Sequence, residues 1–428
     1  MVALDEHARR LGRLVDTLGI VVRTVGPFDT NPVPADWVHV TKLDPEDTKK
    51  LPLLYPLFLR HTSAVSVGGS SDVTAANTEE TFSLLESLSV PAFHEPSEAR
   101  HVTERTREAA AFIAIPEVLN GDSESLVGTL GKGAEYIREE LTPGMLSEKL
   151  PWWTPNRVLD ALANVATSLL LSEAVFEAYI IQNPDSAAAR EANVDEDDLL
   201  SARTAKQHAM AAERHLESEL VYLEYSGTYG DDEAADILAG VADSLDWSRL
   251  WYGGGLDSRE HAQAMLDAGA DTVVVGDIFH DVAAEEAALC ANADSDLSVD
   301  ADVDTIREWV TDHVDVDDSA AARYLSTIPS VSGPVTTAEQ YLVATVETHL
   351  ELERLAERVS EAGPTTRAEL QRLVDEQTAG TVPGERQLRG VTREESTSIA
   401  RTITVDVLAR RLGLDESKLP VSHLSTDL

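Results

Sequence analysis

The sequence has few of the residues on which several classes of protein depend. Its one cysteine, Cys290, excludes an internal disulfide and any cysteine-based metal site. No apolar run reaches the roughly 18 residues that suggest a membrane-spanning helix. The N-terminus also lacks the apolar core of a signal peptide. We therefore expect a soluble, cytoplasmic protein.

Positive charge is scarce as well. The 428 residues include 34 Lys and Arg against 76 Asp and Glu, which gives a formal net charge of -42. This balance argues against nucleic-acid binding, which needs a basic surface. The acidic residues are spread along the whole chain, and self-repulsion is screened at molar salt, where the Debye length is about 3 Å. The composition therefore indicates a protein of a salt-accumulating halophile.

What the sequence does contain is an alternation of short apolar segments with helical segments. This alternation predicts an α/β fold built on a closed parallel (β/α)₈ barrel, a TIM barrel. A barrel takes about 250 residues, so the chain has room for a second part. The eight predicted strands are Trp37–Lys42, Ala64–Gly68, Val90–His94, Phe112–Leu119, Val175–Ile181, Leu220–Tyr225, Leu250–Tyr252 and Thr272–Val275.

The chain divides into four predicted parts. Residues 1–36 form an N-terminal extension with an amphipathic helix candidate, and residues 37–290 form the barrel. The acidic, small-residue stretch 291–304 is typical of a linker. Residues 305–428 are mostly helical in pattern and hold no catalytic motif, so we expect a helical accessory domain that serves interaction or oligomerisation.

The most informative stretch lies between Leu220 and Asp277. Two apolar strands there run into glycine-containing loops, as LVYLEYSGTYGD from Leu220 and RLWYGGGLDSRE from Arg249, and the last strand ends at Gly276. Glycine lets a backbone approach a ligand closely, and helix N-termini favour anions. Such loops after the last strands of a barrel form phosphate sites. We therefore expect a phosphate site here, with tight turns alone as the alternative.

A second set of polar residues follows the first two strands. Asp44 and Ser70 offer a carboxylate and a hydroxyl on neighbouring strands. These oxygens suit Mg²⁺, which keeps water ligands and takes the rest from a phosphate. Taken alone, Asp44 is more typical of a helix N-cap than of a metal ligand.

A series of motifs matches one family of enzymes. In chain order they are HVTKLDP, SVGGS, IPEVLN, NPDS, YLEYSGTYG and YGGGLDSRE followed by VVVGD. Over residues 37–285 the sequence thereby resembles the geranylgeranylglyceryl phosphate synthases and the related bacterial heptaprenylglyceryl phosphate synthases. The resemblance implies a TIM barrel whose third helix is replaced by an extended segment, in keeping with the short connection around Arg100–Arg107.

The resemblance also implies a reaction and its residues. The expected enzyme is a Mg²⁺-dependent prenyltransferase that joins geranylgeranyl diphosphate to the 3-hydroxyl of sn-glycerol 1-phosphate, for archaeal membrane lipids. Glu224 and Lys42 are the expected catalytic residues, with Glu224 accepting the hydroxyl proton, and Asp44 and Ser70 are the expected Mg²⁺ ligands. The expected glycerol phosphate-binding residues are Lys42, Tyr222, Leu223, Glu224, Tyr225, Ser226, Gly227, Gly254, Gly255, Gly276 and Asp277.

Two positions depart from the family's pattern. Asp277 stands where the family usually has Asn, which puts a carboxylate beside a phosphate, and the first strand continues as DPED in place of DPDK.

Three alternative functions stay open: the same chemistry with a longer prenyl chain, an isomerase or lyase acting on another phosphate ester, and a non-catalytic phosphate-binding barrel with a regulatory C-terminal region. We also expect a homo-oligomer with peripheral membrane contact.

Overall fold

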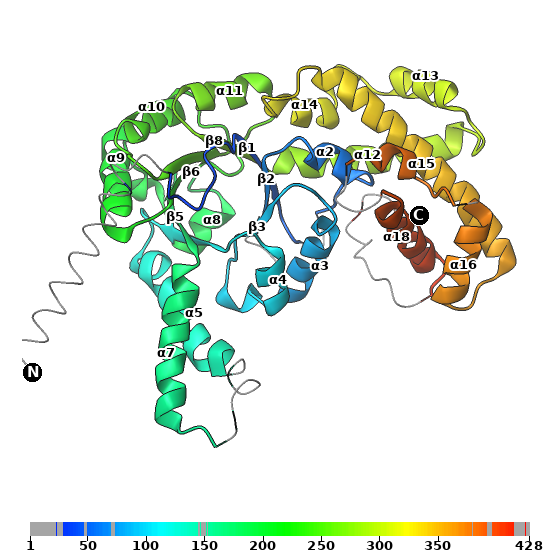
Figure 1. Ribbon diagram of the computed structural model, residues 1–428. Helices are drawn as coiled ribbons and strands as arrows, with labels where there is room; N and C mark the ends of the chain where they lie inside the picture. Colours follow the sequence, from blue (N-terminus) through cyan, green and yellow to red (C-terminus); the bar gives the residue numbers. More distant parts are fainter. Residues whose placement is uncertain are drawn as a thin grey trace, which may run out of the picture.

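Eight parallel strands lie at the positions that the sequence predicts, with small differences at their ends (Figure 1). The computed structural model describes residues 23, 29–46, 49–69, 73–143, 146, 151, 153–378, 380–391, 396–414 and 424. The amphipathic helix candidate of the N-terminal extension lies outside these residues. The strands are β1 (His39–Leu43), β2 (Ala64–Val67), β3 (Ala92–His94), β4 (Ala114–Val118), β5 (Val175–Ile181), β6 (Leu220–Glu224), β7 (Arg249–Gly253) and β8 (Thr272–Val275).

The strands form a barrel in the order β3-β2-β1-β8-β7-β6-β5-β4. The two end strands meet through a bridge between His94 and Ile113. Two backbone hydrogen bonds support it, from His94 N to Phe112 O at 3.1 Å and from Ala111 N to Ala92 O at 2.7 Å. The predicted TIM barrel is thus confirmed. Its outer layer contains α2 (Tyr55–Leu59), α3 (Ala75–Leu85), α9 (Ala202–Ala211), α10 (Asp231–Ala242), α11 (Arg259–Asp267) and α12 (Asp277–Asp296), whereas α8 (Ala187–Ala192) lines the cavity at the mouth of the barrel.

The third connection is short, as the sequence predicts. Between β3 and β4 the chain forms a 3₁₀ turn (Ala99–His101) and the six-residue helix α4 (Glu104–Ala109). The second half of the connection is therefore helical and not extended, because a capping box at Thr103 and Thr106 starts a helix there. The first half leaves Pro96 and Ser97 free to line the cavity at the C-terminal ends of the strands.

A helical arm joins β4 to β5, and Figure 1 shows its helix α7 (Asn156–Ser172) projecting away from the barrel. The arm begins with the π-helical turn Glu124–Gly128, α5 (Thr129–Tyr136) and the π-helical turn Ile137–Leu141. One side of α7 presents an apolar stripe to solvent, with each side chain at least 37% exposed: Val158, Leu162, Val165 and Leu169. The apolar side of this helix is therefore uncovered in the single chain.

The interior of the barrel is apolar at one end and polar at the other. At the apolar end Trp37 stacks on Phe93, with ring centroids 6.0 Å apart. The described part of the N-terminal extension is fixed at this end, because Asn31 Nδ2 donates to the carbonyls of Glu219 (2.8 Å) and Trp247 (2.9 Å). The inward-facing polar side chains gather toward the C-terminal ends of the strands, where TIM-barrel enzymes carry their active sites.

The C-terminal region is helical, as predicted, and it packs directly on the barrel. Its helices are α13 (Val303–His313), α14 (Ala320–Thr327), α15 (Pro334–Ala362), α16 (Arg367–Thr378), α17 (Glu385–Leu388) and α18 (Ser396–Arg411). Helix α14 lies against the outer face of β1, where the Tyr324 hydroxyl is 2.7 Å from Thr41 Oγ1 and Thr327 Oγ1 is 3.1 Å from His39 Nε2. Buried side chains of α12, α14 and α15 share one apolar core with the barrel strands.

The linker expected at 291–304 is helical at both of its ends. Helix α12 runs on to Asp296 and α13 begins at Val303, so only the residues between them form an irregular connection. Helix α12 continues into the acidic stretch because Leu289, Cys290 and Ala293 are buried at helical spacing. The division of the chain into domains stays a prediction.

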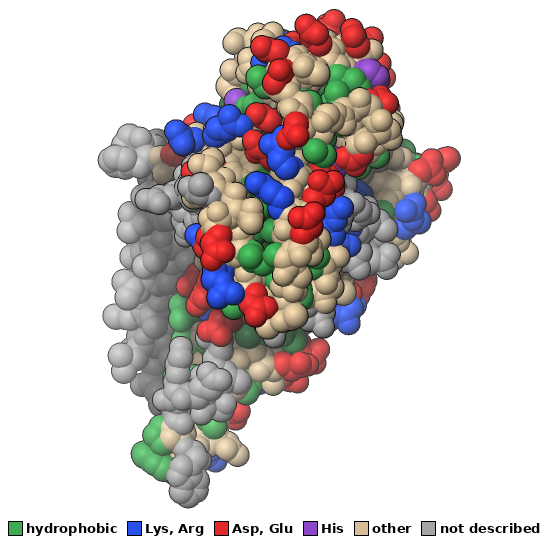
Figure 2. All heavy atoms as spheres, turned by 90° about the vertical axis from the view of Figure 1, so that its right-hand side faces the viewer, with side chains coloured by type: hydrophobic (Ala, Val, Ile, Leu, Met, Phe, Trp, Pro, Cys, Tyr) green, Lys and Arg blue, Asp and Glu red, His purple; other side chains and the backbone are tan. Residues whose placement is uncertain are grey.

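Acidic side chains are spread over the face formed by the C-terminal helices and are interspersed with Lys and Arg (Figure 2). This distribution agrees with the even spread of acid along the sequence. None of the helices that the structure describes is both long enough and apolar enough to cross a membrane.

Candidate active site

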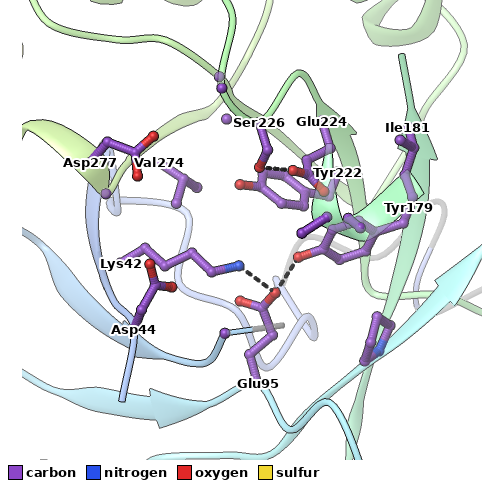
Figure 3. A pocket seen from close by; sticks show the side chains of 18 of the residues that line it. Lys42, Asp44, Glu95, Tyr179, Ile181, Tyr222, Glu224, Ser226, Val274 and Asp277 are labelled. Carbon is purple, nitrogen blue, oxygen red and sulfur yellow. Dashed lines mark hydrogen bonds and ion pairs between the residues drawn. The ribbon is translucent and has the colours of Figure 1, made fainter. Parts of the chain in front are cut away.

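A cavity of about 550 Å³ opens at the C-terminal ends of the strands (Figure 3). Side chains from β1, β4, β5 and β6 line it, together with the loops after β2, β3, β7 and β8. The start of the arm between β4 and β5, α8 and α14 add further lining residues. Among the described lining residues, nine carry a carboxyl group and three carry a positive charge. The cavity is therefore strongly acidic, and each of its cations matters for binding an anion.

Lys42 lies at the centre of a buried polar network. Its Nζ donates to Glu95 Oε1 at 2.9 Å, and the same carboxylate accepts hydrogen bonds from the Tyr179 hydroxyl and from Ser66 Oγ (2.8 Å) (Figure 3). Burial alone would lower the pKa of Lys42, but the attraction of the surrounding acidic groups, Glu95 first, raises it well above its ordinary value. Lys42 is thus a fixed positive charge aimed into the cavity.

Glu224 ends β6 and is 4% exposed. The Ser226 hydroxyl donates a hydrogen bond to Glu224 Oε1. Burial raises the pKa of Glu224, while the positive charge of Lys42 and the hydrogen bond from Ser226 oppose that shift. A buried carboxylate whose pKa lies above its ordinary value is a stronger base than an exposed one, which suits it to accept a proton from a hydroxyl group.

Tyr222 lies across the backbone of Gly253 on the neighbouring strand. A Cβ atom at Gly253 would sit 2.0 Å from the Tyr222 hydroxyl, so only glycine leaves room for this side chain. Burial raises the pKa of Tyr222 well above its ordinary value, although Lys42 opposes the shift. The phenol therefore keeps its proton at neutral pH and can donate a hydrogen bond to a ligand oxygen.

The structure brings Tyr222, Glu224, Ser226 and Gly227 to the cavity, but not the other two predicted residues of this segment. Leu223 lies in the apolar core between barrel and helices, and the Tyr225 hydroxyl donates to Glu233 Oε1 at 3.1 Å. Adjacent residues of a strand point to opposite faces, so a continuous run cannot all reach one ligand.

The glycine loops after β7 and β8 form the other end of the cavity. Gly255 has a φ of +52°, and a Cβ there would lie 2.5 Å from Tyr229 N, so both conformation and space require glycine. Gly254 belongs to the same loop and also lines the cavity. Gly276 lies beside Lys42 and precedes α12, whose first turn lines the cavity. The free N–H groups and the dipole of this long helix favour an anion at that point.

Asp277 lies on the exposed rim of the cavity, beside Lys49. The side chain is 74% exposed, and its Oδ1 lies 3.5 Å from Lys49 Nζ. The departure from the family's Asn is therefore compensated by a cation, and the backbone of α12's first turn remains available to a ligand. Lys49 also forms an ion pair with Asp44.

Asp44 is held by its backbone as well as by its side chain. Its N–H donates to His280 Nε2 at 3.3 Å, and His280 Nδ1 is 3.0 Å from the carbonyl of Lys50. Burial lowers the pKa of His280, with the charge of Asp44 opposing the shift, so the ring is neutral and donates through Nδ1 to Lys50. Among the described residues the next helix is α2, so Asp44 caps no helix there.

The oxygen atoms around Asp44 fit a hard divalent cation. A Cβ at Gly69 would lie 3.3 Å from Asp44 Oδ1 and 3.4 Å from Glu46 Oε1, so both carboxylates face the loop that leads toward Ser70. Ser70 itself lies outside the described residues. The described part of the chain holds no cluster of three or more His, Cys, Asp or Glu side chains placed to bind a metal. One or two carboxylates are enough for Mg²⁺, which completes its shell with water and substrate phosphates.

The sequence did not single out Glu95, Tyr179, Lys49 or His280. Glu95 directly follows the third predicted strand, which is where a barrel places functional side chains, and this position was the available signal. Tyr179 faces inward by the alternation of β5. Lys49 and His280 belong to no motif, and only the folded chain brings them to Asp44.

The fold and this cavity define a TIM-barrel protein with glycine loops at the C-terminal ends of its last strands. The chain belongs to the PcrB family, whose sequence pattern matches residues 34–293. It is 32% identical over 253 residues to the geranylgeranylglyceryl phosphate synthase of Haloquadratum walsbyi, covering 58% of this chain and 88% of that protein. It is 31% identical over 249 residues to the heptaprenylglyceryl phosphate synthase of Bacillus thuringiensis, covering 57% of this chain and 91% of that protein.

A solved structure is also similar. The crystal structure of (S)-3-O-geranylgeranylglyceryl phosphate synthase from Thermoplasma acidophilum, in complex with its substrate sn-glycerol-1-phosphate, is 23% identical with a TM-score of 0.42. The matched region covers 57% of this chain and 86% of the Thermoplasma acidophilum chain. The relatives by sequence are thus prenylglyceryl phosphate synthases, and the resemblance predicted from the motifs is confirmed.

Proposed function

We propose that the protein is a prenyltransferase that forms an ether bond between a prenyl diphosphate and the 3-hydroxyl of sn-glycerol 1-phosphate. The observation that carries this proposal is the placement of Glu224 and Lys42 in one cavity with the glycine loops, in a chain whose relatives are named as prenylglyceryl phosphate synthases. A barrel that only binds a phosphate ester has no need of a buried base at that place.

The phosphate of the glycerol substrate binds at the glycine-loop end. Backbone N–H groups of Gly255, Gly276 and the first turn of α12 contact it, and the charge of the adjacent Lys42 adds attraction. This anchors the glycerol so that its 3-hydroxyl faces Glu224 and Tyr222. Holding the nucleophile in one orientation supplies much of the rate enhancement.

The reaction then transfers one proton and one prenyl group. The 3-hydroxyl oxygen attacks carbon one of the prenyl chain, the bond from that carbon to the diphosphate breaks, and diphosphate leaves with the bonding electrons. Glu224 accepts the hydroxyl proton, and Ser226 holds its carboxylate in place. The neutral Tyr222 donates a hydrogen bond to a substrate oxygen, which steadies the geometry.

The diphosphate needs a cation of its own, because carboxyl groups outnumber basic side chains on the cavity wall. In this proposal Asp44 and Ser70 would hold Mg²⁺, and Glu46, which faces Gly69 together with Asp44, would lie close to it. When bound, Mg²⁺ neutralises the diphosphate and makes it a better leaving group.

Geranylgeranyl diphosphate is the proposed donor, with a longer chain as the alternative. The archaeal and the bacillary relatives are almost equally similar, at 32% and 31% identity, so identity alone does not choose between four and seven isoprene units. The net charge of -42 supports a halophilic archaeon and a salt-rich cytoplasm, where the product would enter membrane lipids. A homo-oligomer and peripheral membrane contact remain part of the proposal.

The test is an incubation of the purified protein in molar KCl with Mg²⁺, labelled sn-glycerol 1-phosphate and prenyl diphosphates of three to seven isoprene units. We expect a butanol-extractable labelled product that is most abundant with four units. Labelled sn-glycerol 3-phosphate is the matched control and should give little product. A folded protein that gives no product with any donor would refute the prenyltransferase and favour the non-catalytic alternative.

A further inference from the structure

One cation of the cavity comes from outside the part of the chain that the family shares. Arg323 lines the cavity from α14, whereas the family match ends at residue 293. The other two lining cations are engaged by close carboxylates, Lys42 by Glu95 at 2.9 Å and Lys132 by Glu124 at 2.6 Å.

The guanidinium of Arg323 is only partly satisfied. Its Nη1 lies 3.6 Å from Asp257 Oδ2, which is longer than a hydrogen bond. Its Nε is buried and has no hydrogen-bond partner among the described residues, while the side chain as a whole is 40% exposed. The exposed part of the side chain lies on the cavity wall, where a ligand acceptor would supply the hydrogen bond that the 3.6 Å contact with Asp257 does not.

Arg323 lies at the glycine-loop end of the cavity. Its neighbour Asp257 follows Gly255 by two residues, and Ile278 and Asp281 of α12 line the same end. A planar guanidinium donates two parallel hydrogen bonds to phosphate oxygens, a geometry that an ammonium group lacks. Because many carboxylates on the cavity wall repel a phosphate, a guanidinium that donates to the phosphate oxygens offsets that repulsion.

Helix α14 is fixed from several sides, so Arg323 is held in place. The Tyr324 hydroxyl contacts Thr41 of β1 at 2.7 Å, and Glu285 of α12 accepts from Ala321 N at 3.4 Å. Beyond α14, the carbonyl of Val331 accepts from Arg259 Nη2 of α11 at 2.6 Å. A side chain on such a supported element binds without first ordering its helix.

We propose that Arg323 binds the phosphate group of the glycerol substrate, so that the C-terminal helical region completes the phosphate site of the barrel. The identity of the ester rests on the proposed function, whereas phosphate binding by Arg323 does not. Asp257 then serves as the resting partner that the phosphate replaces. The region beyond the family match thereby contributes a ligand-binding residue to the site.

The experiment measures binding, by calorimetry in the full-length protein, of sn-glycerol 1-phosphate and of inorganic phosphate. R323Q should weaken both by roughly 10- to 100-fold, as expected for loss of charge-assisted hydrogen bonds, and should leave the KM for prenyl diphosphate unchanged. R323K should recover only part of the affinity. R307Q, which removes an exposed arginine of α13 that pairs with Asp304, is the control and should bind as the wild type does.

Two further variants separate binding from a structural ion pair. D257N should bind phosphate as tightly as the wild type or more tightly, and R323Q/D257N should keep the loss seen in R323Q. Unchanged affinity in R323Q, or wild-type affinity in the double variant, would overturn the proposal. A wild type that binds phosphate through Arg323 but forms no ether product would instead refute the prenyltransferase, so the two failures are distinguishable.

Discussion

Replacing Glu95 by Gln removes the charge that holds Lys42 in the cavity. The ion pair is mostly buried, with the side chains of Lys42 and Glu95 25% and 12% exposed, and the same carboxylate also accepts from Tyr179 and Ser66. Removing one partner of a buried pair leaves the other uncompensated, which costs about 3 kcal/mol of unfolding free energy. We also expect kcat to fall, because Lys42 is then drawn toward the other carboxylates of the cavity.

The matched control is Glu98→Gln. Glu98 is 53% exposed and pairs with Arg100 at 2.8 Å on the surface of the same loop. Exposed pairs contribute about 0 to 1 kcal/mol, so this variant should be close to the wild type. Urea unfolding at fixed molar KCl compares the two, since salt screens the exposed pair far more than the buried one. Equal stability and equal kcat in both variants would refute the central role of Glu95.

The pH dependence gives a second check on the Glu95 prediction. The folded-state pKa of Lys42 is raised, so the stability from its pairing is fully present below the unfolded pKa, about 10.4. It is lost only as pH rises through the higher folded value. The difference between wild type and E95Q should therefore stay constant from neutral pH to about 9.

Three further predictions concern the reacting groups. Lys42→Met should move the acid limb of the kcat/KM profile to higher pH, because the positive charge of Lys42 opposes the raised pKa of Glu224; an unmoved limb would contradict that coupling. Gly253→Ala should lower kcat at least about tenfold by displacing Tyr222, and should be tolerated better in a Tyr222→Phe background, which steady-state kinetics can show. Asp44→Asn should raise the Mg²⁺ concentration for half-maximal activity by roughly tenfold or more, and an unchanged Mg²⁺ titration would remove Asp44 from the metal site.

The barrel could be predicted because its strands carry a strong local signal. A parallel strand is covered on both faces, so Val175–Ile181 and Thr272–Val275 appear in the sequence as short runs of mainly apolar residues. The glycine requirements at the loop after β7 are equally local, since Gly254 and Gly255 adopt positive φ values. The alternation of β6 would also have shown that Leu223 cannot reach the cavity with its neighbours.

The rest of the site depends on contacts between distant parts of the chain. Glu95 becomes the partner of Lys42 only because β1, β2 and β3 are neighbours in the barrel. Arg323 meets Asp257 because α14 packs beside α11 and α12, and nothing in the local pattern of α14 indicates a ligand. Such partners follow from topology and packing, which periodicity and composition do not determine.

The most direct test of the proposed mechanism compares the wild type with Glu224→Gln in one assay that follows both binding and ether formation from labelled sn-glycerol 1-phosphate. We predict that the variant still binds the labelled substrate but forms product roughly 100- to 10,000-fold more slowly, as expected when a general base is removed. Glu260→Gln, an exposed carboxyl on α11, should match the wild type in both respects. Product formation by Glu224→Gln at the wild-type rate would contradict the mechanism.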